Sequence, residues 1–169
     1  MKPAVKFGLL NGGLAILWSL LMYITGLNRN SNAQWISILQ LAIPIAMMAM
    51  AVNEYKRTTG NGWITFGKAF NQSFMVGLIG GVIGTAFYFL YISFIDPTFL
   101  DFQMEQQMEK MVERGMNDEL IEQSMKQVAF FMKPAMQCVF GLLFVLIASA
   151  LLGLLVAAVL KKPNPEEIS

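Results

Sequence analysis

Four long runs of apolar residues, separated by polar stretches, dominate the chain. They span about residues 7–27, 35–52, 69–95 and 135–160, and none of them contains Asp, Glu, Lys or Arg. A helix of about 20 apolar residues crosses the roughly 30 Å hydrocarbon layer of a bilayer. Helix is the expected form because each backbone polar group then finds its partner within the segment. The pattern predicts an all-α membrane protein with a single four-helix transmembrane domain over residues 1–169.

Two of these runs carry a second signal. Pro44 lies inside the second run, where it should kink the helix or loosen one turn. The first run follows Lys2 and Lys6 and precedes small residues at 31–33, as a secretory signal peptide would. Its apolar stretch is too long for a signal peptide, and the small residues lie too far beyond it. We therefore expect the first run to be a span that is retained.

Between the third and fourth runs, the segment 96–134 has the periodicity of amphipathic helices. Asp96 is expected as the N-cap of a first helix with a proline at its first position, and Gly115 as its end. Asn117 is expected to cap a second helix. Apolar residues share one face in each of the two, namely Leu100, Met104, Met108, Met111 and Val112, then Ile121, Met125, Val128 and Met132. The segment thus predicts a helical hairpin, packed on itself or lying on the membrane surface.

Positive charge in short loops predicts the orientation, because such loops stay cytoplasmic. With the N-terminus inside, the termini and the loop 54–68 carry seven basic and three acidic residues. The short outer loop near 28–34 carries only Arg29. The segment 96–134 carries four basic and eight acidic residues and falls outside. Both termini are therefore predicted to be cytoplasmic.

Small residues recur along the runs at four-residue spacing, which lets another helix backbone approach closely. The expected contact residues are Gly8, Gly12, Ser73, Gly77, Gly80, Gly81, Gly84 and Gly153. They could pack the bundle against itself, which we favour, or they could bind a second copy or a partner subunit.

One further surface has a regular pattern. Asp101, Glu105, Glu109 and Glu113 repeat at four-residue spacing and form an acidic stripe. Like charges at this spacing cost about 0.2–0.5 kcal/mol per pair, so the stripe does not serve helix stability. It is either a solvated face kept off anionic lipid, which we favour, or a docking face for a basic partner or loosely held divalent cations.

The amino-acid composition limits which kinds of catalytic and metal site the chain can form. Apolar residues make up 56% and charged residues 14%, against about 25% charged in soluble domains. There is no histidine, and the single cysteine, Cys138, excludes an internal disulfide and a Cys₄ zinc site. Proton relays and ion-coupled carriers hold ionisable groups at membrane depth, and these runs have none. A net charge of +1 produces no overall positive field that would attract nucleic acid. We expect no catalytic, cofactor-binding or metal-binding residues, although Met104, Met108 and Met111 share a face that a soft ion could use.

Several blocks together resemble a known family. They are the run 62–70 (GWITFGKAF), the glycine-rich third run, and the following 95–100 (IDPTFL). In this order they are similar to the Bacteroidota inner-membrane proteins grouped as "domain of unknown function 4199". The resemblance covers nearly the whole chain. It implies four helices, a bacterial inner membrane and an association with polyprenol-phosphate glycosyltransferases, and it supplies no catalytic residues.

The sequence thus predicts a non-catalytic membrane subunit or scaffold that binds the lipid bilayer and another membrane protein or itself. Two alternatives stay open. One is an oligomeric passive pore or small-solute carrier. The other is an interfacial enzyme acting on lipid, which would need Glu54, Asp96 or Asp101 as acid or base.

Overall fold

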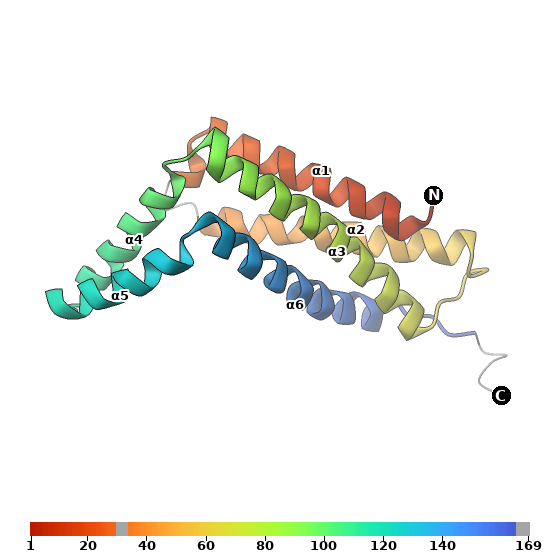
Figure 1. The fold of residues 1–169 in the computed structure, drawn as a ribbon. Coiled ribbons are helices and arrows are strands. Elements are labelled where there is room, and N and C mark those ends of the chain that lie inside the picture. Colours follow the sequence, from red (N-terminus) through yellow and green to blue (C-terminus); the bar gives the residue numbers. More distant parts are fainter. Residues whose placement is uncertain (30–33, 165–169) are drawn as a thin grey trace. The chain divides into compact units, whose positions relative to one another are not determined.

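The computed structural model describes residues 1–29 and 34–164, and that part of the chain is all-α (Figure 1). Six α-helices follow one another in the described residues: α1 Pro3–Ile24, α2 Gln34–Thr58, α3 Phe66–Leu90, α4 Phe99–Glu113, α5 Asp118–Phe131 and α6 Pro134–Leu160. A 3₁₀ turn, Leu27–Arg29, follows α1, and one π-helical turn, Tyr91–Ile95, extends α3. The predicted all-α class is confirmed.

Three of the described helices are long and apolar enough to cross a bilayer. They are α1 with 22 residues, α3 with its π-helical turn over 30 residues, and α6 with 27 residues. Their large apolar side chains, such as Leu17, Phe144 and Leu155, are exposed, as residues that face lipid would be. The chain is therefore a multi-pass membrane protein.

The second apolar run lies within α2, which continues through Pro44 to Thr58. This helix is not among the three that meet the length and apolarity of a span. Its last turns hold Glu54, Lys56 and Arg57. The outer loop expected near 28–34 and the small residues at 31–33 fall largely outside the described residues, as do Glu166 and Glu167.

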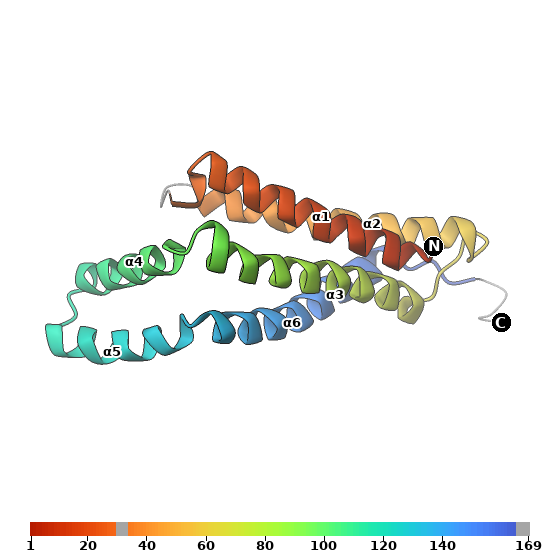
Figure 2. The same cartoon turned by 45° about the horizontal axis from the view of Figure 1, so that its top comes forward.

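The chain forms two compact units. The first comprises Met1–Gly84 and Leu142–Ser169, and in it α1 and α2 lie side by side (Figures 1 and 2). Its apolar core draws on α1, α2, α3, α6 and the loop after α2, through Ala4, Phe7, Met48, Ala51, Val52, Ile64, Ala69, Val76, Val156 and Ala157. Residues at both ends of the sequence thus share one core.

The second unit, Thr85–Gly141, contains the end of α3, the helices α4 and α5, and the start of α6. The helices α4 and α5 contact each other. Aromatic rings pack where the chain enters α4 and where it leaves α5: Tyr91 meets Phe99 edge-on at 5.6 Å, and Phe131 meets Phe140 at 5.4 Å between centroids. The apolar faces expected in 96–134 are only partly covered, because Met108 and Val112 remain exposed.

The helix boundaries in this unit correct one expectation and confirm two. Asp96 is not the N-cap of α4, which begins at Phe99 after Thr98 and has no side-chain cap. The Asp96 carboxylate instead accepts hydrogen bonds from Tyr91 and Thr98, so it is unavailable to the helix. Gly115 does end the first helix, in the left-handed conformation with φ +71°. Asn117 caps α5, accepting a hydrogen bond from the Leu120 N–H at 2.8 Å.

Candidate functional site

The small residues of α1 lie against branched residues of α3. A Cβ added to Gly8 would come within 2.8 Å of the Ile79 Cβ, and one added to Gly12 within 2.8 Å of the Ile83 Cβ. Real Cβ atoms do not approach so closely, so the two helices could not keep this spacing with a larger residue at either position. The pair Gly8 and Gly12 therefore serves packing between α1 and α3 within the chain.

The glycines of α3 fit around side chains from three other helices. A Cβ at Gly77 would clash with Ser149 of α6 and would lie 2.7 Å from the Met48 Cε of α2. A Cβ at Gly81 would clash with Val145 of α6. Gly80 faces Asn11 of α1, whose Cβ would be 2.8 Å away. The sequence predicted these three glycines as contact residues. It could not show that side chains of the first unit fill the space beside all three.

The remaining small residues differ from one another. A Cβ added to Gly153 of α6 would make an ordinary van der Waals contact with the Phe70 ring, at 3.5 Å. Ser73 is fully buried, and its hydroxyl has no hydrogen-bond partner in the described residues. Gly84 has no neighbour within 4 Å of an added Cβ. Among the predicted contact residues, Gly84 is thus the one that the helices of the first unit leave open.

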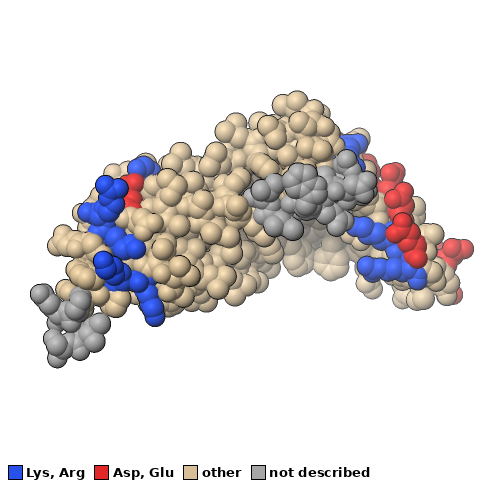
Figure 3. Space-filling view, turned by 180° about the vertical axis from the view of Figure 1, so that it is seen from behind, with Lys and Arg blue, Asp and Glu red and all other residues tan. Residues whose placement is uncertain are grey.

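The acidic stripe of α4 lies on the surface. Asp101, Glu105, Glu109 and Glu113 are all exposed, and none forms an ion pair within the described residues. Figure 3 shows acidic side chains on the surface of α4 and α5. Met108 and Val112 are also exposed, with 44% and 59% of their area accessible, and each immediately precedes a member of the stripe. An acidic and an apolar stripe therefore run next to each other along α4.

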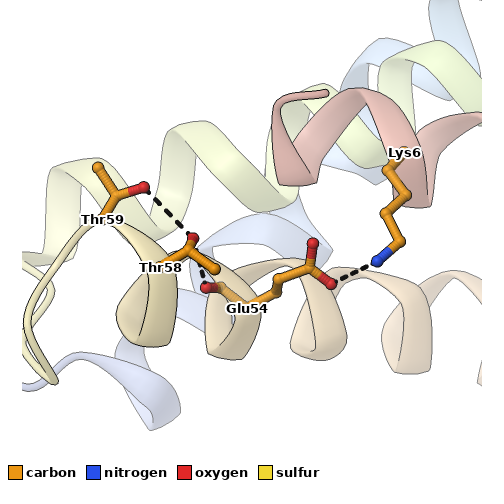
Figure 4. A network of polar contacts seen from close by, with 4 residues as sticks. All are labelled: Lys6, Glu54, Thr58 and Thr59. Carbon is orange, nitrogen blue, oxygen red and sulfur yellow. Dashed lines mark hydrogen bonds and ion pairs between the residues drawn. The ribbon is translucent and has the colours of Figure 1, made fainter.

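An ion pair joins α1 to the end of α2. Lys6 Nζ donates to Glu54 Oε2 at 2.7 Å, while Thr58 donates to the Glu54 backbone carbonyl at 2.9 Å (Figure 4). Both charged side chains are partly exposed, so the pair contributes at most about 1 kcal/mol to stability. Its main consequence is that Glu54 already has a cationic partner.

The loop after α2 is fastened to the chain after α6, a feature that the sequence did not indicate. Ile64 and Lys162 exchange two backbone hydrogen bonds, of 2.8 and 2.9 Å. The Lys162 ammonium lies 4.5 Å from the centroid of the Trp63 ring. We call this arrangement of Trp63, Ile64 and Lys162 the loop clamp. A single bridge of this kind, between residues 98 positions apart, leaves no periodic pattern in the sequence.

A second cation caps α6. Lys56 Nζ donates to the Leu160 carbonyl at 3.1 Å, which satisfies one of the backbone oxygens left open at a helix C-terminus. Together with the loop clamp and the Lys6–Glu54 ion pair, this bond brings basic residues from the start of α1, the end of α2 and the chain after α6 to one end of the first unit. Figure 3 shows Lys and Arg side chains gathered there.

The family model described as "Protein of unknown function (DUF4199)" matches residues 6–162. The chain belongs to the DUF4199 family. The match confirms the resemblance carried by 62–70 and 95–100, and it covers both compact units. No curated protein and no solved structure matches the chain.

In this DUF4199 member, the three carboxylates considered for lipid chemistry have different surroundings. Glu54 is paired with Lys6, and Asp101 is exposed on α4. Asp96 is buried, with 4% of its area accessible, and accepts hydrogen bonds from the Tyr91 hydroxyl at 3.0 Å and the Thr98 hydroxyl at 3.1 Å. Sequence reasoning missed the Tyr91–Asp96 pair because the π-helical turn between them, which sets their spacing, is not predictable from residue type.

Proposed function

We propose that this DUF4199 protein is a non-catalytic subunit or scaffold of a bacterial inner membrane, which binds another membrane protein through the outward face of α4. The glycines on which a partner could dock are mostly occupied by the chain's own helices. A partner surface must therefore lie elsewhere. The strongest support is the pairing of an acidic and an apolar stripe on α4, both of them uncovered in the described residues.

The electrostatic and hydrophobic cost of leaving α4 uncovered supports a partner at this helix. Four carboxylates at four-residue spacing repel one another along α4, and no ion pair with the described residues relieves them. Exposed Met108 and Val112 add apolar area that a partner would remove from water. A partner with a basic and apolar surface matches both stripes, since charge complementarity and apolar burial act together at interfaces. The resemblance implies a polyprenol-phosphate glycosyltransferase as one such partner.

We propose further that α2 is a fourth span, so that both termini are cytoplasmic. The support is that α2 lies along α1, a 22-residue helix long enough to cross the bilayer, and that Met48, Ala51 and Val52 share the core with it. The charged end of α2 meets the start of α1 through the Lys6–Glu54 ion pair. The segment of α4 and α5 then lies on the extracytoplasmic side as an amphipathic hairpin.

Co-purification tests the proposed function. The full chain would be crosslinked in native membranes, extracted in mild detergent and analysed by mass spectrometry. One variant removes three charges from α4, through Glu105→Gln, Glu109→Gln and Glu113→Gln. The matched control removes three from α5, through Asp118→Asn, Glu119→Gln and Glu122→Gln.

We expect one identified membrane protein to be retained by the native chain and by the α5 control. The α4 variant should retain it at least about tenfold less, which corresponds to about 1.4 kcal/mol of binding free energy. A clean monomer from native membranes, or equal retention by both variants, would contradict the proposal.

A further inference from the structure

Basic residues gather at one end of the first unit, and the function proposed for α4 does not involve them. Seven cationic residues lie there, within the first six residues, the end of α2, the start of α3 and the two residues after α6: Lys2, Lys6, Lys56, Arg57, Lys68, Lys161 and Lys162. The described residues at this end contain a single acidic residue, Glu54. We call these seven residues the basic collar.

Three members of the collar are occupied by the fold. Lys6 pairs with Glu54, Lys56 binds the Leu160 carbonyl, and Lys162 lies over Trp63. The other four are exposed, and their side chains form no ion pair or hydrogen bond with the described residues: Lys2, Arg57, Lys68 and Lys161. Three of the cations therefore stabilise the fold at this end, and the other four remain exposed.

The positions of the span ends place the collar at headgroup depth. The three helices long enough to cross a bilayer begin or end here, at Pro3, Phe66 and Leu160. Every collar residue on α1, α3 and α6 lies within three residues of such an end. Trp63 and the exposed Phe66 add the aromatic side chains that are typical of the interface between lipid and water.

We propose that the basic collar binds the phosphates of anionic lipid headgroups, with Lys2, Arg57, Lys68 and Lys161 as the direct ligands. Several cations against one acid give the charge complementarity that an anionic headgroup requires. The loop clamp helps to form the collar. Its two backbone hydrogen bonds hold the loop between Arg57 and Lys68 next to Lys161 and Lys162, which come about one hundred residues later in the chain. This proposal does not depend on a partner at α4, and either can fail alone.

Lipid-dependent stability tests the collar. The purified full chain in uncharged detergent would be heated with added phosphatidylglycerol, phosphatidylcholine or inorganic phosphate. The variant Arg57→Gln with Lys161→Gln removes two free cations and leaves the loop clamp intact. The control, Lys110→Gln with Arg114→Gln, removes the same charge from α4.

We expect phosphatidylglycerol to raise the unfolding temperature of the native chain and the control more than phosphatidylcholine does. The collar variant should lose at least half of that preference. A preference that the two variants lose equally, or that neither loses, would overturn the proposal. Stabilisation by inorganic phosphate alone, to the same extent, would overturn the assignment to a lipid.

A measurement on the native chain alone guards against a variant that fails to fold. A phosphatidylglycerol carrying a photoreactive group in its headgroup would be reconstituted with the protein and irradiated, and the labelled peptides identified. Labels concentrated in 1–6, 54–68 and 160–164 are expected. Labels spread evenly over the loops, including 114–117, would contradict the collar.

Discussion

At the scale of single residues, a glycine within the α3 span is required only where another helix fills the space beside it. Gly81 and Gly84 lie less than one helical turn apart on α3. Val145 of α6 fills the space beside Gly81, whereas no atom of the described residues lies within 4 Å of a Cβ added to Gly84. The spacing of small residues in the sequence names both positions equally. Which glycines are needed follows from the rotation of α3 against α6, and a repeat of small residues does not fix that rotation.

This difference gives a matched pair of substitutions. Gly81→Leu should destabilise the chain by about 1–3 kcal/mol, the usual cost of forcing a larger side chain into a packed contact. Gly84→Leu should not destabilise the chain and should stabilise it by up to about 1 kcal/mol, because the site is open and leucine favours helix over glycine. Unfolding of the two variants in a series of detergent mixtures with increasing sodium dodecyl sulfate would measure this. Equal destabilisation would show that Gly84 also lies in a contact.

The buried carboxylate of Asp96 is a second test at this scale. Tyr91→Phe removes the hydroxyl that donates to Asp96 at 3.0 Å, while keeping the ring that packs on Phe99. Losing one hydrogen bond to a buried carboxylate should cost about 1.5–3 kcal/mol. The control is Tyr88→Phe, since the Tyr88 hydroxyl has no hydrogen bond within the described residues. Thermal unfolding that ranks the two variants equally would argue against the Tyr91–Asp96 bond.

At the scale of elements, local signals set the helix ends well where a single residue decides them. Asn117 and Gly115 lie where capping and left-handed backbone preferences predict. Asp96 has the same preference, but its carboxylate is bound by Tyr91 and Thr98, so tertiary contacts override the local signal. The loop clamp depends entirely on such contacts and therefore could not be predicted from the loop's own residues.

The turn that leads into the loop clamp has its own test. A Cβ at Gly60 would collide with the Trp63 carbonyl, so Gly60→Ala should open this turn and release Ile64 from Lys162. Gly67→Ala is the control, because Gly67 lies in α3 with open space beside it and alanine favours helix by about 1 kcal/mol.

Hydrogen exchange at the Ile64 and Lys162 amides reports this directly, since both are bonded across the loop clamp. We expect faster exchange at both amides in Gly60→Ala and unchanged exchange in Gly67→Ala. Unchanged protection in both variants would mean that the loop clamp does not depend on this turn.

At the scale of the whole molecule, charge-free apolar length is a strong signal because the cost of leaving such runs in water is large. It predicted the helices α1, α3 and α6 and the position of α2. The candidate site was less predictable. The spacing of residues identified both the small residues and the acidic stripe. It could not show that side chains from distant segments pack against most of the glycines, whereas the acidic stripe stays exposed.

We propose that the loop after α2 and the helix α4 lie on opposite sides of one membrane, with α2 as a span. This proposal is tested most directly by single-cysteine labelling in intact cells, in a Cys138→Ser background. Thr59→Cys and Glu109→Cys, both exposed, would be treated with a maleimide that does not cross membranes. We predict that position 109 is labelled in spheroplasts and that position 59 is labelled only after the membrane is opened. Labelling of both positions from the same side would show that α2 does not separate the loop from α4 as a span.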